Sequence, residues 1–238
     1  MTSFRKSVLL TAALAVAAML GAPGLARADL EIALQEDAGA RTVVATGASF
    51  TTAAFNGVFG DFTVSILGGA SHNAATLSDL LGSTTNIANN SGATHTLKIF
   101  ITQDGYTLPV GPQLKVESGL AITSNIAGVT LTNIFQAFAD KNNNLFGTSD
   151  FTNGPQTAIA NGSTADTGSA NGVFTRNATP YSVTSVSSFQ VTGGSSTNFS
   201  NHVNLTAAGV PAPAGLVLAA SGVPVLALGW LRRRKVQA

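Results

Sequence analysis

Three side-chain oxygen donors occur at alternate positions of one short stretch, at Asp140, Asn142 and Asn144. These residues occupy positions 1, 3 and 5 of a loop, where a calcium-binding loop places its first ligands. The pattern then departs from such a loop, because position 6 is Leu145 instead of Gly and position 12 is Phe151 instead of Glu. The alternative is an Asn-rich turn between strands, since Asn tolerates left-handed backbone. We expect the turn and keep the three residues as a weak calcium candidate.

The other residues that could do chemistry match no known catalytic pattern. Gly47–Ser49 comes nearest to the nucleophile elbow Gly-x-Ser-x-Gly, but Thr51 stands where the second Gly should be. His72, His95 and His202 are too far apart for metal-ligand spacing, and acidic residues occur singly. The absence of cysteine excludes disulfides and thiolate chemistry. We therefore predict that the protein is not an enzyme and needs no cofactor or metal.

The elements that must position these residues are β-strands. Apolar and polar residues alternate with period two, which is typical of strands that bury one face. Gly- and Asn-rich turn signals separate the strands, and Thr84–Asn89 and Thr94–Thr102 are predicted to form a hairpin around Asn90–Ala93. Roughly ten short strands predict an all-β fold, an antiparallel, jelly-roll-like β-sandwich. The clearest alternating stretches are Leu30–Leu34, Phe62–Ile66, Leu97–Ile101, Leu114–Ile122, Val129–Phe135 and Phe199–Leu205.

Residues 29–209 are predicted to form this single domain, since they are long enough to bury a sizeable core. They contain five basic residues and all eleven acidic ones, which gives a net charge of −6. An acidic domain repels phosphate backbones, so nucleic acid is excluded as a partner.

Residues 1–28 are predicted to be a secretory signal peptide. Arg5 and Lys6 supply the positive start, and Val8–Leu20 is an apolar stretch too short to span a bilayer comfortably. Ala26 and Ala28 supply the small residues of a cleavage site. The alternative is an uncleaved N-terminal anchor, but the short apolar stretch and the cleavage site favour export.

The C-terminal tail, residues 210–238, has three parts in a fixed order. Val210, Pro211 and Pro213 form a short Pro-rich motif, and the apolar segment Ala214–Leu231 follows. As a helix this segment would be about 27 Å long, just enough to cross a hydrocarbon core. The basic residues that close the tail would stay on the cytoplasmic side; they are Arg232, Arg233, Arg234 and Lys235. A buried core helix is the alternative, and it does not explain these cations.

This tail resembles the PEP-CTERM sorting signal, which exosortase-type proteases process in Gram-negative bacteria. The resemblance rests on the Pro-rich motif, the apolar segment and the basic end, with Ala212 where the usual motif has Glu. It implies export, a membrane anchor and an exosortase-like processing protease. After processing it implies a cell-surface or extracellular location, in an exopolysaccharide-associated setting. The stretches Leu77–Thr102, Tyr181–Val191 and Thr197–Thr206 are also similar to β-sandwich domains of PEP-CTERM proteins.

Three classes of function remain open at this point. We expect a non-catalytic surface or extracellular-matrix protein that contacts exopolysaccharide or other surface proteins. Its edge strands could support self-association. The alternatives are a carbohydrate-binding module and a secreted hydrolase on a β-sandwich. The first alternative lacks aromatic platforms, because Trp230 lies in the tail and the only tyrosines are Tyr106 and Tyr181. The second lacks a catalytic motif.

Overall fold

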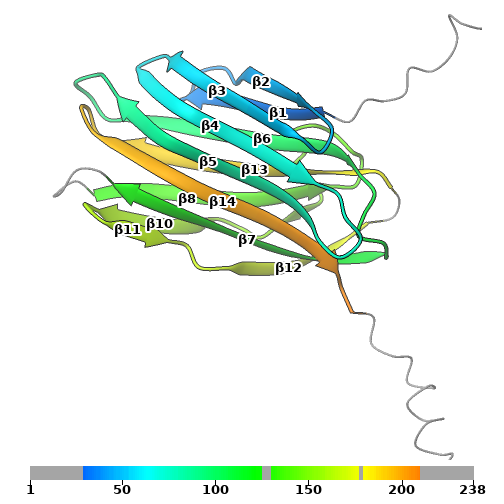
Figure 1. Cartoon of the computed structure of the whole chain (residues 1–238). Coiled ribbons are helices and arrows are strands. Elements are labelled where there is room, and N and C mark those ends of the chain that lie inside the picture. Colours follow the sequence, from blue (N-terminus) through cyan, green and yellow to red (C-terminus); the bar gives the residue numbers. More distant parts are fainter. Residues whose placement is uncertain (1–28, 125–129, 177–178, 210–238) are drawn as a thin grey trace, which may run out of the picture. The chain divides into compact units, whose positions relative to one another are not determined.

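The domain is a sandwich of two antiparallel β-sheets (Figure 1). The structure is a computed structural model that describes residues 29–124, 130–176 and 179–209. The chain divides into the units Met1–Ala207 and Ala208–Ala238, and all described strands lie in the first. The predicted all-β antiparallel sandwich is confirmed. The predicted signal peptide at 1–28 and the sorting tail at 210–238 lie outside the described residues.

Each sheet has seven strands. Sheet A runs in the order β10 (Gln156–Asn161), β8 (Thr130–Asp140), β13 (Tyr181–Val191), β6 (His95–Tyr106), β1 (Asp29–Glu36) and β2 (Thr42–Ala48), with β9 (Phe151–Thr152) beside β8. Sheet B runs in the order β11 (Thr164–Asp166), β7 (Gln113–Ser124), β14 (Ser196–Ala207), β5 (Ser78–Asn89), β4 (Phe62–His72) and β3 (Thr52–Phe59), with β12 (Ala170–Thr175) beside β7. Within the described residues, no helix is long and apolar enough to cross a membrane.

The winding of the chain is that of a jelly roll. Strands β5, β6, β7 and β8 alternate between sheet B and sheet A, so each connection crosses from one sheet to the other. The late strands then insert between them, β13 between β6 and β8 in sheet A and β14 between β5 and β7 in sheet B. This arrangement agrees with the jelly-roll-like prediction. Strands β1 to β4 extend both sheets on one side.

The core lies between the sheets and uses the predicted apolar faces. The inward-facing apolar residues of the stretches that begin at Leu30, Leu97 and Leu114 are buried, as are Phe199, Val203 and Leu205. Burial of these side chains is the main stabilising contribution, at about 1.5–3 kcal/mol for each large apolar residue. One end of the core is aromatic, where Tyr106 stacks on Tyr181 with ring centroids 5.5 Å apart. Period two therefore identifies the buried faces correctly.

The predicted hairpin between Thr84–Asn89 and Thr94–Thr102 is wrong. Strand β5 pairs with β4 and β14 in sheet B, whereas β6 pairs with β1 and β13 in sheet A. The connection crosses the end of the sandwich instead of turning back in one sheet. The side chain of Asn89 holds it there, donating hydrogen bonds to the carbonyl oxygens of Ala93 and Val191, each at 2.8 Å.

Candidate ligand-binding groove on sheet B

A row of small side chains crosses the solvent-facing side of sheet B. In antiparallel sheets, residues directly opposite each other project on the same face. The pairing Ala54–Gly68–Ser83–Ser200–Ala121–Asp166 therefore places one residue from each of β3, β4, β5, β14, β7 and β11 side by side. Every member before Asp166 has at most two side-chain heavy atoms. This first row forms the shallow floor of a groove.

A second row runs beside the first. It pairs Thr52, Ala70, Leu81, His202 and Gly119 across β3, β4, β5, β14 and β7. Its small members lie over the outer strands, while Leu81 and His202 stand near the middle. The two rows together line one continuous surface depression, which we call the sheet-B groove.

The sheet-B groove has two adjoining parts, of about 520 Å³ over β3, β4 and β5 and about 280 Å³ over β7 and β14. Both parts are bounded by Ser200 and Asn201, so they meet on β14. Six neighbouring strands spaced by ~4.8 Å give the groove a length of ~24 Å. It is therefore long enough for an extended chain and too shallow to enclose a small molecule.

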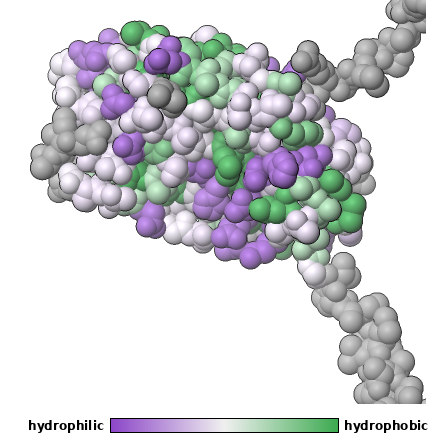
Figure 2. Space-filling view, viewed as in Figure 1, coloured by the Kyte–Doolittle hydropathy of each residue, from purple (hydrophilic) through white to green (hydrophobic). Residues whose placement is uncertain are grey.

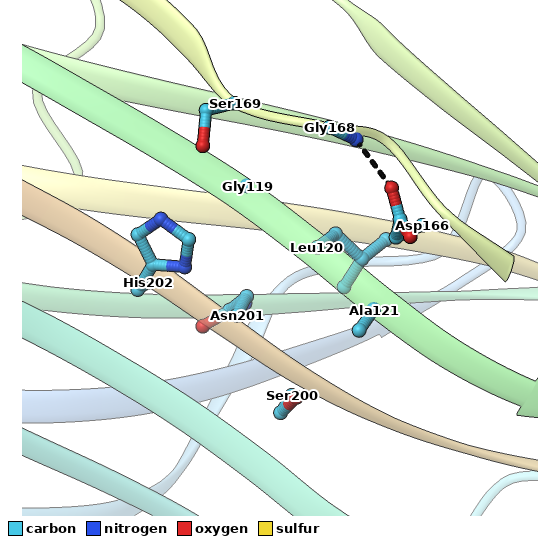
Figure 3. A pocket seen from close by; sticks show the side chains of 9 residues that line it. All are labelled: Gly119, Leu120, Ala121, Asp166, Gly168, Ser169, Ser200, Asn201 and His202. Carbon is cyan, nitrogen blue, oxygen red and sulfur yellow. Dashed lines mark hydrogen bonds between the residues drawn. The ribbon is translucent and has the colours of Figure 1, made fainter.

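One end of the groove carries its most polar groups (Figure 3). His202 and Ser169 lie on one side of Gly119, and Asp166 lies on the other. Gly119 is required here, because a Cβ at this position would lie 2.8 Å from the carbonyl oxygen of Gly168 and 3.0 Å from the His202 ring. The Gly168 amide donates to Asp166 Oδ1 at 2.8 Å, which leaves the second carboxylate oxygen for other partners.

The lining of the groove has little charge. It contains hydroxyl groups on Thr52, Ser83, Ser169 and Ser200, and Asp166 is the one acidic residue. No Lys or Arg is among its lining residues. Figure 2, which faces sheet B, shows pale residues of intermediate hydropathy between purple hydrophilic and green hydrophobic patches. Such a surface offers hydrogen bonds and flat apolar contact to a neutral polar chain.

Sequence reasoning identified only part of this groove. The alternation in β14 predicts that His202 lies on the polar face, and the structure places it in the groove, partly exposed. Nothing in the sequence pairs His202 with Leu81 or Gly119, because those pairings depend on strand order and register. The other two histidines lie elsewhere. His72 ends β4 opposite Asp79, and His95 begins β6 beside Asp37.

The calcium candidate forms a turn in the β8–β9 loop. Asp140 Oδ1 accepts a hydrogen bond from the Asn142 amide at 2.6 Å, and Asp140 Oδ2 accepts one from Asn144 Nδ2 at 3.2 Å. Lys141 reaches the end of the same loop, with its Nζ 3.0 Å from Asp150 Oδ1. Both oxygens of Asp140 are therefore engaged by the loop itself. Ser49, from the incomplete nucleophile pattern, lies in the connection between β2 and β3.

The described aromatic side chains are all at least partly buried. Tyr106 and Tyr181 lie in the core, and their hydroxyls donate to the carbonyl oxygens of Asp79 at 2.5 Å and Leu108 at 2.6 Å. Burial raises the pKa of both phenols. Neither ring is available for stacking on a ligand.

A second depression of about 400 Å³ lies on the outer face of sheet A. Its lining includes Lys98, Phe100 and Phe138. The Arg41 guanidinium lies over the rings of Phe100 and Phe146, at 5.3 and 4.0 Å from the ring centroids. This contact covers part of the aromatic surface. The depression also spans only the strands β6, β8 and β13, whereas the sheet-B groove spans six strands.

The predicted sorting residues Val210, Pro211 and Pro213, the basic end and the cleavage residues Ala26 and Ala28 lie outside the described residues. Their predicted roles therefore stay predictions.

Comparison with known proteins gives no family for this chain. No family model and no curated protein matches it. Among solved structures it is similar to TmCBM61, determined in complex with β-1,4-galactotriose, with 11% identity and a TM-score of 0.29, over 63% of this chain and 92% of that one. It is also similar to TmCBM27, a carbohydrate-binding module studied for mannan recognition, with 7% identity and a TM-score of 0.29, over 63% and 90%. Likeness this slight supports no inference about ligands.

Proposed function

We propose that this chain is an exported, non-catalytic protein of the cell surface or extracellular matrix, and that its sheet-B groove binds a neutral glycan chain. The observation that supports this most is the pair of small-residue rows across sheet B. Small side chains let a flat polymer approach the sheet closely over ~24 Å. Hydroxyl, imidazole and carboxylate groups along the rows would fix its orientation.

The groove favours a glycan over other chain-like ligands. A polypeptide in extended form binds best to a sheet edge, where main-chain groups are unpaired. On the face of sheet B the main-chain groups of β4, β5, β14 and β7 are already paired with neighbouring strands. Anionic polymers need cationic residues to bind them, and the lining of the groove contains no Lys or Arg. A neutral sugar chain needs only the hydrogen bonds and apolar contact that this lining supplies.

The same residues support binding without hydrolysis. Glycoside hydrolysis normally needs two carboxyl groups about 5–9.5 Å apart across the scissile bond. Asp166 is the single carboxylate among the lining residues of the groove. His202 does not supply the second carboxyl group. The groove therefore has the groups for holding a sugar chain and lacks the pair for cleaving it.

Binding can be tested by isothermal titration of soluble oligosaccharides and polysaccharides into residues 29–209. We expect at least one neutral glycan to bind the wild-type fragment. Ser200→Arg places a long side chain where the two parts of the groove meet, so it should weaken binding at least tenfold, or roughly 1.4 kcal/mol. Thr157→Arg is the control, since Thr157 is an exposed strand residue of β10 in sheet A. Equal binding by both variants would place the ligand elsewhere.

The two ends of the chain determine where this function is carried out. We propose cleavage after Ala28, a membrane anchor at 214–231 held by the basic residues Arg232 to Lys235, and recognition of Val210–Pro213 by an exosortase-like protease. Mass spectrometry of both termini of the native protein tests this. We expect Asp29 at the start and loss of the apolar segment in the released form. An intact C-terminus in protein recovered from the matrix would contradict processing of this tail.

A further inference from the structure

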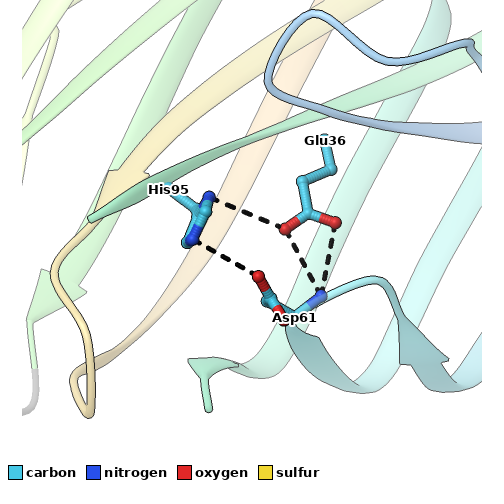
Figure 4. A group of neighbouring side chains, drawn as sticks. All are labelled: Glu36, Asp61 and His95. Carbon is cyan, nitrogen blue, oxygen red and sulfur yellow. Dashed lines mark hydrogen bonds and ion pairs between the residues drawn. The ribbon is translucent and has the colours of Figure 1, made fainter. Parts of the chain in front are cut away.

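Three turns that are distant in sequence bring a histidine and two carboxylates together at one end of the sandwich. Glu36 ends β1, Asp61 lies in the turn between β3 and β4, and His95 begins β6. One ligand atom from each residue lies within 4.8 Å of the others. Figure 4 shows both carboxylates on the same side of the imidazole ring, with Glu36 facing one ring nitrogen and Asp61 the other. The group joins sheet A, through Glu36 and His95, to sheet B, through the β3–β4 turn.

A third carboxylate orients the imidazole from behind. Asp37 Oδ2 lies 2.7 Å from His95 Nδ1, and Asp37 Oδ1 accepts a hydrogen bond from the Thr96 amide at 2.8 Å. The Asp37 amide also donates to the Thr96 carbonyl oxygen at 2.8 Å. With Nδ1 donating to Asp37, the neutral ring presents its Nε2 lone pair toward Asp61. A carboxylate behind the ring is the usual partner of a metal-bound histidine, where it fixes the tautomer and increases ligand basicity.

The backbone leaves room for the Glu36 carboxylate. Gly60 has φ +58°, and a Cβ at this position would collide with Glu36 Oε2. The Asp61 amide lies 3.3 Å from each Glu36 oxygen, which holds the carboxylate beside the Asp61 side chain. A larger residue at position 60 would therefore displace the Glu36 carboxylate from its present position. This arrangement brings two anionic oxygen donors and one nitrogen donor within 4.8 Å of one another.

We propose that Glu36, Asp61 and His95 form a binding site for a divalent transition-metal ion of the zinc class. An imidazole beside two carboxylates suits zinc better than calcium or magnesium, which take oxygen ligands. His95 Nε2 and Asp61 Oδ2 are 3.3 Å apart. Two ligands of a tetrahedral ion with bonds of ~2.0–2.1 Å are separated by ~3.3 Å. Glu36 Oε1 lies 3.9 Å from His95 Nδ1, the nitrogen that Asp37 also faces, so its side chain must rotate toward Nε2 to complete the set.

The site is independent of the sheet-B groove and has a structural role. A metal held by these residues would connect the β1–β2 turn and the start of β6 in sheet A to the β3–β4 turn in sheet B. Such a connection stabilises the folded state by mass action, because the unfolded chain does not assemble the three ligands. The fourth coordination position faces solvent and would be filled by water.

The test uses the full chain without an affinity tag, purified in mild detergent and stripped of metal with a chelator. Titration with zinc chloride should show one saturable site, and zinc should raise the melting temperature. His95→Gln and Asp61→Asn should each weaken zinc binding at least tenfold. Asp37→Asn, which removes the carboxylate behind the ring, should weaken it about 10–100-fold. Replacing zinc by cobalt(II) should give the absorption bands of a tetrahedral site, and His95→Gln should remove them.

The other two histidines provide matched controls. His72→Gln and His202→Gln should bind zinc as tightly as the wild type, because neither residue belongs to the cluster. Circular dichroism of every variant checks that the β-structure is retained. The proposal is overturned if the wild type binds no zinc, or if His95→Gln binds it as tightly as His72→Gln does. If the cluster binds only a proton, the wild type will bind no zinc.

Discussion

Burial and ion pairing shift the pKa values of single carboxyl groups in this domain in opposite directions. Asp79 is half-buried in β5, opposite His72 of β4. Burial raises its pKa above the ordinary value of 3.8, and the nearby His72 only partly offsets this. Asp150 shows the opposite behaviour. Hydrogen bonding to Lys141, whose Nζ is 3.0 Å from Asp150 Oδ1, lowers the pKa of its carboxyl.

These shifts predict how two isosteric variants depend on pH. A raised pKa means that the charged form of Asp79 costs folding free energy, so Asp79→Asn should be more stable than wild type at pH 7. That difference should shrink as pH falls through the raised pKa toward 3.8. Asp150→Asn should be less stable than wild type at pH 7, and this loss should disappear as pH falls below the lowered pKa. Urea unfolding at pH 7, near pH 4 and near pH 2 measures both, and shifts of the same sign at pH 7 would contradict the assignment.

At the scale of single residues, the sequence predicts which face of a strand a side chain occupies, but it does not predict which distant residues that side chain contacts. It places Lys98 on the exposed side of its strand, and it leaves Glu36, Asp61 and His95 as unrelated residues. The distance between them in the chain hides the cluster, because only the crossing from β5 to β6 brings His95 to the turns of β1 and β3. Arg176 is a similar case. It is buried, and its guanidinium donates to the carbonyl oxygens of Gly111, Thr107 and Pro109.

At the scale of elements, four of the edge strands lack the usual protection against pairing, whereas the edge strand β11 contains Asp166. Natural sheets commonly place charged residues or proline on their edges. Strands β2, β3, β10 and β12 contain neither. Each presents an exposed apolar side chain, namely Val43, Val58, Ile159 and Val173. This composition favours association of copies through their edges, which suits a matrix protein.

Charge introduced on one edge should therefore reduce self-association. We expect residues 29–209 to associate at high concentration, and Val58→Lys on β3 to weaken this roughly tenfold, or about 1.4 kcal/mol. Val110 is a matched control, because it is as exposed as Val58, at 69%, and lies in the connection between β6 and β7. Sedimentation equilibrium measures both variants. A wild-type fragment that stays monomeric, or equal effects of Val58→Lys and Val110→Lys, would count against edge pairing.

The strands themselves are largely predictable from the sequence, whereas their pairing is not. The stretch Leu114–Ile122 lies within β7, since period two marks a strand locally. Tyr181–Val191, which the resemblance to other β-sandwich domains indicates, has the bounds of β13. The error at Asn90–Ala93 has a physical reason. An Asn- and Gly-rich connection permits a tight turn but does not determine whether the next strand pairs with the previous one or crosses to the other sheet.

The groove illustrates the same limit. Its first row depends on register shifts such as the one between Thr197 and Phe199 in β14. A shift of one residue in β14 would turn Ser200 inward and bring Asn201 to the surface. Alternation alone therefore cannot predict that Gly68, Ser83 and Ser200 become neighbours.

At the scale of the whole molecule, residues 29–209 combine a net charge of −6 with a groove whose lining has little charge. The hydrophobic core is built from residues between Leu30 and Leu205, so the described domain has its own interior. This independence fits the proposed role of residues 29–209 as a binding unit. The central claim is that a glycan chain lies along the rows of small side chains on sheet B.

The most direct measurement of this claim is amide chemical-shift mapping by NMR, with ¹⁵N-labelled residues 29–209 titrated with the glycan that binds best by calorimetry. We predict shifts that form one band across β4, β5, β14 and β7, centred on Gly68, Ser83, Ser200 and Ala121. The Ser200→Arg variant should lose this band. Shifts centred on Phe100 and Phe138 of sheet A, or none at all with every glycan, would contradict the account.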